Sequence, residues 1–282
     1  MHTPEIVLLG GPNSGKTHYF GQLYGRLRRH AGQLQIRNEQ GTPTDLSALK
    51  EVLHCLENGH AASHTPTGTW AEVLLPLVDA QGNEMNLRWP DYGGEQLETV
   101  FKDREVPEAW RDRLSKADGW VLLIRLRKET TYPDVLAELS ERAKHSNGSV
   151  ARPGVWDANA RWVELLQILL HVAGLGTVAR LRSPRLTVLL SCYDELETSE
   201  ALPSKVLATH LPLVSAFIHS LWADDAVSVW GLSALGCALD KDSENDKFID
   251  EGPEHQGWVI APNGGEPDAD LTQPLAWLLK AS

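Results

Sequence analysis

The sequence is poor in cysteine, in basic residues and in long apolar runs, and each shortage disfavours a class of protein. Its three cysteines, Cys55, Cys192 and Cys237, are far apart and odd in number, which fits neither a disulfide framework nor a CxxC metal site. Lys and Arg number 26 against 38 Asp and Glu, so a general electrostatic attraction to nucleic acid or to an anionic membrane is disfavoured. No apolar run reaches the ~18 residues that a membrane-spanning helix needs.

The remaining composition is typical of a globular protein in a reducing compartment. Hydrophobic residues make up 42% of the 282 residues and charged residues 23%, which suits a chain with a sizeable core. The first residues, Met1 to Pro4, lead into a strand-like run without the charged region and cleavage site of a secretory leader. We therefore expect a soluble cytoplasmic protein with no membrane span.

A glycine-rich motif follows at once. Residues 6–17 read IVLLGGPNSGKT, and Gly10, Gly15, Lys16 and Thr17 fit the pattern GxxxxGK[ST]. A buried parallel strand is predicted before the motif and a helix from Thr17 to Arg29 after it, because apolar residues recur there at near-helical spacing. Strand, glycine loop and helix in this order predict a phosphate-binding loop.

The chemistry of this loop assigns roles to its residues. Backbone N–H groups curl around phosphate oxygens, and the helix N-terminus adds partial positive charge. Lys16 would neutralise the β- and γ-phosphates and Thr17 would ligate Mg²⁺. We expect Gly10, Asn13, Ser14, Gly15 and His18 to complete the contacts with the nucleotide, and Lys16 also to assist catalysis.

A second group of phosphate and metal contacts is predicted after a β-hairpin. Residues 70–78 and 85–89 read as strands joined by a turn at 79–83, and Asp91 follows the returning strand. Asp91 is placed to hold Mg²⁺ through water, and Gly94 to offer its N–H to a γ-phosphate. Ahead of the hairpin, the polar Gly/Pro segment 64–69 supplies Thr67 as a candidate second Mg²⁺ ligand.

Contacts with the base are predicted farther along the chain. Two buried-strand patterns, 119–124 and 186–190, precede the tetrapeptide Ser191 to Asp194. A carboxylate beyond a parallel strand can accept hydrogen bonds from N1–H and the 2-amino group of guanine, which adenine cannot donate. The last predicted strand, 226–230, leads to Ser233 and Ala234, whose backbone N–H groups could meet the guanine oxygen.

With these motifs in this order, the chain resembles the translation-factor and Ras-like class of P-loop GTPases. Gly10 to Thr17 matches the first motif of that class, Thr67 the second, Asp91 to Gly94 the third, Ser191 to Asp194 the fourth and Ser233-Ala234 the fifth. The resemblance implies an α/β three-layer fold, with a mostly parallel sheet of about six strands and one antiparallel edge pair, that binds GTP or GDP with Mg²⁺.

A closer resemblance is to the prokaryotic double-GTPase families. It rests on the opening Gly-Gly-Pro-Asn-Ser-Gly-Lys-Thr, on the Gly-Gly-Glu after Asp91 and on a terminal helix near 271–280. Members of those families are predicted parts of bacterial conflict systems, so this resemblance implies a dedicated partner protein.

Several positions depart from the family pattern. The fourth motif is usually Asn-Lys-x-Asp, but here Ser191 replaces the Asn and Cys192 the Lys, whose aliphatic stem normally lies across the base. Glu95 stands where Ras-like proteins carry the Gln that orients the attacking water, and its negative charge predicts slow turnover. Asn13 also resembles the Asn that holds K⁺ in potassium-activated GTPases, so K⁺ is a possible further cofactor.

We expect one P-loop GTPase domain over residues 1–282, with inserted segments at about 32–63 and 127–185 and a C-terminal extension after about 237. Both inserts contain helical runs whose apolar stripes are predicted to face the core. Two arginines, Arg125 and Arg127, leave the strand 119–124 near the phosphate side. Exposure to solvent, an ion pair and an in-cis arginine finger are the alternative roles.

The sequence thus predicts a GTP-binding switch with slow hydrolysis of GTP to GDP and phosphate, read by a partner protein. Two alternatives stay open. One is an ATPase or small-molecule kinase that keeps the phosphate loop and uses Asp194 otherwise. The other is an interaction module that binds nucleotide without turnover, which Glu95 and the altered fourth motif favour.

Overall fold

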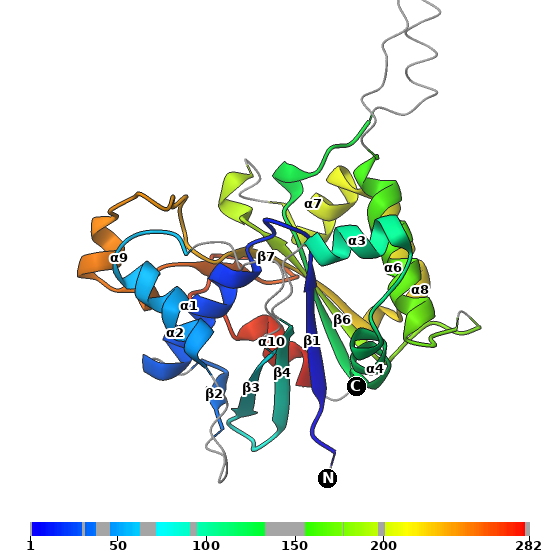
Figure 1. The fold of residues 1–282 in the computed structure, drawn as a ribbon, viewed down its shortest axis with the longest axis horizontal. Helices are drawn as coiled ribbons and strands as arrows, with labels where there is room; N and C mark the ends of the chain where they lie inside the picture. The colour runs from blue at the N-terminus through cyan, green and yellow to red at the C-terminus, as the bar shows by residue number, and fades with distance from the viewer. Residues whose placement is uncertain are drawn as a thin grey trace, which may run out of the picture.

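The computed structural model describes residues 2–29, 32–37, 46–62, 72–90, 95–132, 156–176, 178–196 and 201–279 (Figure 1). Its centre is an eight-stranded sheet with the strand order β2-β3-β4-β1-β5-β6-β7-β8. The strands span Glu5–Gly10 (β1), Leu34–Ile36 (β2), Glu72–Asp79 (β3), Glu84–Pro90 (β4), Gly119–Ile124 (β5), Arg185–Ser191 (β6), Val227–Ser233 (β7) and Trp258–Ile260 (β8).

The five central strands run parallel, and both edges are antiparallel. Strand β1 pairs in parallel with β4 and β5, and the parallel pairing continues through β6 to β7. Antiparallel pairs add β3 and β2 at one edge and β8 at the other. The α/β class and the mostly parallel sheet are therefore as predicted.

The sheet has eight strands where about six were predicted, and antiparallel pairs lie at both of its edges where one was predicted. The two extra strands, β2 in the first insert and β8 in the C-terminal extension, have three residues each. A strand of three residues is too short for the period-2 alternation that identifies strands in a sequence.

Helices cover both faces of the sheet (Figure 1). The described α-helices span Lys16–Arg29 (α1), Ser47–Glu57 (α2), Glu95–Asp103 (α3), Glu108–Lys116 (α4), Ala158–Val172 (α6), Pro203–His210 (α7), Pro212–Leu221 (α8), Asp246–Asp250 (α9) and Gln273–Leu279 (α10). Short 3₁₀ turns span Leu126–Lys128 (η1), Tyr193–Glu195 (η2), Asp224–Ala226 (η3) and Pro253–His255 (η4). Helices α7 and α8 are separate because Pro212 lacks the N–H that a continuous helix requires.

The helices form a hydrophobic core on each face of the sheet, and the helices α2 and α6 of the two inserts belong to these cores. On one face, α4, α6, α7 and α8 pack on the central strands, and the stripe of α6 is buried from Trp162 to Leu170. On the other face lie α1, α2 and α10. In α2, Leu49, Leu53 and Leu56 are buried, as the apolar stripe predicts.

The C-terminal extension is fastened to α1 and to the end of α2. The buried side chain of Arg26 donates to the carbonyl oxygens of Gln256 at 2.7 Å and Gly257 at 3.0 Å. At the end of α2, the N–H of Ala61 donates to the carbonyl oxygen of Asp240 at 2.9 Å. These bonds hold the segment that follows β7 above the carboxyl end of the sheet.

Across the described ranges, no helix combines the length and the apolar character needed to cross a membrane.

We predict that Leu56→Ala lowers the free energy of unfolding by about 2–5 kcal/mol, the usual effect of truncating a fully buried leucine. Leu213→Ala on α8, where the side chain is 60% exposed, should change it by less than about 0.5 kcal/mol. Urea unfolding of both variants measures the difference. Equal stability of Leu56→Ala and the wild-type protein would show that this end of α2 is not packed against Phe248 of α9.

Candidate functional site

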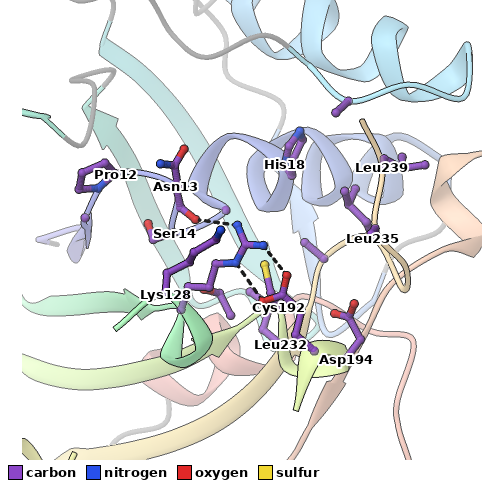
Figure 2. A pocket seen from close by; sticks show the side chains of 18 of the residues that line it. Pro12, Asn13, Ser14, His18, Lys128, Cys192, Asp194, Leu232, Leu235 and Leu239 are labelled. Carbon is purple, nitrogen blue, oxygen red and sulfur yellow. Dashed lines mark hydrogen bonds and ion pairs between the residues drawn. The ribbon is translucent and has the colours of Figure 1, made fainter. Parts of the chain in front are cut away.

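A cavity of about 720 Å³ lies at the carboxyl end of the parallel strands (Figure 2). Successive parts of its wall come from the loop after β1, the turn after β6 and the loop after β7. Since β1, β5, β6 and β7 are neighbours and run parallel, the segments that leave them meet at one edge of the sheet. The sites predicted near residues 10–18, 191–194 and 233–234 therefore come together.

The loop between β1 and α1 has the backbone of a phosphate-binding loop. Asn13 and Gly15 adopt left-handed conformations, with φ of 56° and 79°. A Cβ atom at Gly10 would lie 2.7 Å from Ser14 Oγ, so the first glycine is needed for the tight curl of the loop. The loop ends at Lys16, the first residue of α1.

The Lys16 side chain is folded back across this loop. Its Nζ donates to the carbonyl oxygens of Gly10 at 2.6 Å and Gly11 at 2.7 Å, and lies 3.3 Å from Ser14 Oγ. The side chain is buried. A positive charge is thus held at the N-terminus of α1, where the helix dipole also favours an anion.

The turn after β6 lies directly against the phosphate loop. A Cβ atom at Gly15 would lie 3.9 Å from Cys192 Sγ and 4.0 Å from Ser191 Cβ. The Ser191 hydroxyl is buried and has no hydrogen-bond partner among the described residues. Cys192 is left-handed, with φ of 50°, and leads into η2, which places Asp194 on the exposed rim of the cavity.

The thiol that replaces the usual lysine of the fourth motif is not a charged group at neutral pH. Burial raises the pKa of Cys192 to about 11, although the positive charge of Arg125 opposes the rise. The thiol therefore stays protonated near pH 7, and the position carries no cation.

The loop after β7 is shaped by Ser233 and borders the cavity through Ala234. Ser233 Oγ accepts a hydrogen bond from the N–H of Gly236 at 2.9 Å, so this hydroxyl closes the turn. Gly257 packs closely against this loop, and no larger residue fits there, because a Cβ atom would lie 2.3 Å from the Ala234 carbonyl oxygen. Ala61, Leu235 and Leu239 add apolar wall on this side.

An arginine that leaves β5 connects the phosphate loop with the turn after β6. Arg125 forms a fork with Glu195, in which Nε donates to Oε2 at 3.0 Å and Nη2 pairs with Oε1. Its Nη1 donates to the Asn13 carbonyl oxygen at 3.4 Å. The dashed lines in Figure 2 mark these interactions, beside Asn13 and Cys192.

Four further lining residues were missed by the sequence interpretation. Lys128 and Glu129 lie at η1, and Arg161 and Trp162 belong to α6 in the second insert. Arg161 pairs with Glu129 at 2.5 Å, and a Cβ atom at Gly11 would contact the Trp162 ring at 3.9 Å. No motif in the sequence indicates these residues, because their place depends on how the insert packs.

The predicted site residues have different outcomes. Asn13, Ser14, Gly15, His18, Ser191, Asp194 and Ala234 line the cavity. Gly10, Lys16, Thr17 and Ser233 lie next to these loops, at the end of β1, the start of α1 and the end of β7, and do not line the cavity. Thr67, Asp91 and Gly94 lie outside the described residues, and of Glu95 the structure gives only that it begins α3.

The metal site is described only in part. Thr17 lies in the first turn of α1, next to Lys16, which is where a hydroxyl ligand for Mg²⁺ is expected. Within the described residues, no group of three or more His, Cys, Asp or Glu side chains gathers in a metal-binding arrangement.

The sequence of the chain matches the model of one protein family. A family model described as "DO-GTPase1: Double-GTPase 1" matches residues 7–278, which is nearly the whole chain. No curated protein matches the sequence.

Comparison with solved structures finds similarities at low identity. The Arl6 BBS3 small GTPase from Trypanosoma brucei, solved with the nucleotide analogue GppNp, is 9% identical with a TM-score of 0.41, and the match covers 98% of this chain and 95% of that one. The signal recognition particle receptor SRb-GTP/SRX complex from Chaetomium thermophilum is 16% identical with a TM-score of 0.38, and the match covers 85% of this chain and 94% of that one. The GTPase-like domain of Ski7 from S. cerevisiae, bound to GDP and phosphate, is 13% identical with a TM-score of 0.39, and the match covers 82% of this chain and 43% of that one.

The raised pKa of Cys192 predicts that its thiol is alkylated slowly. In a Cys55→Ser/Cys237→Ser variant, alkylation by iodoacetamide at pH 8 should be about 100-fold slower than that of a free cysteine, because so little thiolate is present. The rate should increase with pH until about pH 11. A rate at pH 8 equal to that of a free cysteine would contradict the burial of this thiol.

Proposed function

The chain belongs to the Double-GTPase 1 family and is thus a GTP-binding protein of the P-loop class, and we propose that it is a GTP-binding switch with slow, Mg²⁺-dependent hydrolysis. In this proposal the chain acts as one domain in the cytoplasm. A partner protein reads whether GTP or GDP is bound, and a bacterial conflict or defence system is the setting that the family resemblance suggests.

One observation carries the proposal: a single cavity joins the loop 11–15 to Asp194. The first end offers the backbone N–H groups of a glycine loop and the N-terminus of α1, and Lys16 adds a cation. The other end offers a carboxylate. A nucleotide needs these two chemistries at opposite ends, with its phosphates at the loop and its base at the carboxylate.

Guanine is the base that suits this carboxylate. Asp194 has two oxygens that can accept from N1–H and from the 2-amino group of guanine, whereas adenine has neither donor. Ala234 lines the same cavity, and we assign its backbone N–H to the guanine oxygen. Asp194 is exposed, so its discrimination depends on the bound base covering it. A site in which the base buries such a pair can prefer GTP over ATP by up to about 10⁴-fold, since the wrong base then leaves the carboxylate unpaired.

Hydrolysis is assigned to the phosphate end. Lys16 would stabilise the charge that develops on the β- and γ-phosphates, and Thr17 would hold Mg²⁺, which supplies positive charge between those phosphates. We place Thr67, Asp91 and Gly94 around the γ-phosphate and the metal. Glu95 would accept the proton of the attacking water, but its negative charge repels the γ-phosphate, which accounts for a slow rate.

Potassium is a further candidate cofactor. Asn13 is exposed and lines the cavity at the phosphate loop, so its side-chain oxygen is available for a monovalent cation. A cation beside the phosphates can increase the hydrolysis rate by up to about 10³- to 10⁵-fold when it takes the place of an arginine finger.

The first prediction from this function concerns base choice. Labelled GTP should bind with Mg²⁺ far more tightly than ATP, and Asp194→Asn should reduce this preference by at least about 10-fold, because an amide nitrogen cannot accept a hydrogen bond. Asp242→Asn, on an exposed acid of the C-terminal extension, is the matched control. Equal affinity of the wild-type protein for GTP and ATP would refute the guanine assignment.

The second prediction concerns the phosphate loop. Lys16→Ala should reduce GTP and GDP affinity by at least about 100-fold, because it removes a buried cation next to the phosphates. Isothermal titration at fixed Mg²⁺ measures the change, with thermal unfolding as the control for folding. Full affinity for GTP and GDP in this variant would show that the loop 11–15 does not bind the phosphates.

The third prediction separates a switch from its two alternatives. With GTP bound, a single turnover should release free phosphate slowly, and K⁺ should increase the rate over Na⁺ if Asn13 holds that cation. Transfer of phosphate to an added acceptor would favour a kinase. The absence of release with either cation would favour a binding module without turnover.

A further inference from the structure

The fourth motif lacks a cation that its family pattern usually has. Cys192 stands at the position of the lysine, and its thiol is neutral near pH 7. In the pattern, the aliphatic stem of that lysine lies across the base. Another group must cover the base in this cavity if the nucleotide is held in the same way.

A cation lies between the phosphate loop and this motif, and it comes from a different strand. Strand β5 lies between β1 and β6 and pairs in parallel with both. Arg125 directly follows β5, so it leaves the sheet between the phosphate loop and the turn that contains Cys192. The guanidinium reaches both, since Nη1 donates to the Asn13 carbonyl oxygen at 3.4 Å and the other nitrogens bind Glu195.

The guanidinium is held rigidly and remains charged. Glu195 accepts from Nε and Nη2 in a two-point fork, which fixes the plane of the guanidinium. The pKa of Arg125 lies above its ordinary value, mainly because its side chain is hydrogen-bonded to Glu195. Burial lowers this pKa, but the nearby acidic groups raise it further. Arg125 and Glu195 both line the cavity with Asp194.

We propose that Arg125, held by Glu195, takes over the role of the missing lysine and clamps the nucleoside part of the nucleotide between the phosphate loop and the Asp194 turn. This inference rests on the proposed function, because it names a further binding residue of the same cavity. A planar guanidinium also suits a purine, since it can stack on an aromatic face. Arg125 is therefore a binding residue for GDP and GTP alike.

An in-cis arginine finger is the competing role for the same side chain. A finger acts on the charge of the γ-phosphate during hydrolysis, so it leaves GDP affinity unchanged. The observed contacts favour the clamp, because the guanidinium is bound by both oxygens of Glu195 and its remaining nitrogen contacts the loop backbone. The two roles therefore differ in a measurable way.

The test compares Arg125→Ala, Arg125→Lys and Glu195→Gln with the wild-type chain. Fluorescently labelled GDP and GTP report dissociation constants and dissociation rates at fixed Mg²⁺, and single-turnover phosphate release reports hydrolysis. Arg37→Ala is the matched control, because Arg37 also pairs with a carboxylate, Glu84, but lies just after β2 and not at the cavity.

We expect Arg125→Ala to weaken GDP and GTP binding by the same factor, about 10- to 100-fold, mainly through faster dissociation. Arg125→Lys should recover part of the lost affinity. Glu195→Gln should weaken GDP and GTP binding by about 3- to 10-fold, since the arginine remains but is less firmly held. Should Arg125→Ala fail to fold, the other two variants carry the test.

Other results overturn the inference in distinguishable ways. Unchanged GDP affinity in folded Arg125→Lys and Glu195→Gln variants contradicts the clamp, and a slower hydrolysis rate in the same proteins assigns Arg125 as a finger. If the wild-type chain itself binds neither labelled GDP nor labelled GTP, the proposed function falls, and the inference that rests on it falls as well.

Discussion

The parallel pairing of four neighbouring strands is the constraint on which the rest of the site depends. Because β1, β5, β6 and β7 run in the same direction, the chain leaves each of them at one edge of the sheet. The glycine loop, Arg125, the Asp194 turn and the Ser233 loop are far apart in the sequence but border or adjoin one cavity. Buried aliphatic residues of both cores fix that sheet, so they also fix the spacing of the site.

The cavity is far less acidic than the chain as a whole. The formal net charge is −12, whereas the cavity is lined by Arg125, Lys128, Arg161 and Lys241 against Glu129, Asp194, Glu195 and Asp240, and Lys16 lies beside it at the start of α1. The local balance of charge matters more than net charge for a small anionic ligand, because the interaction falls off with distance and is screened by salt. The composition argues against a broad nucleic-acid surface and is consistent with a nucleotide site.

The sequence predicted what is local and periodic. The central strands, helix α1 and the residues of the glycine loop follow from buried runs, helical spacing and one motif, and the Asp194 turn follows from its place after a strand. The short edge strands β2 and β8 were missed because three residues carry too little pattern. Arg125 was placed on the phosphate side, but its bonds to Glu195 and Asn13 could not be predicted, since they depend on which strands are neighbours. A cation-bearing residue after β5, combined with a missing lysine in the fourth motif, is the signal that could have indicated it.

A crystal structure of the protein with a non-hydrolysable GTP analogue and Mg²⁺ tests the central claim most directly. The account predicts phosphates against the backbone of Gly10 to Thr17, Thr17 on the metal, and the guanine edge paired with the Asp194 carboxylate in the same cavity. Density for the analogue elsewhere on the molecule, or for a base that does not contact Asp194, would contradict it.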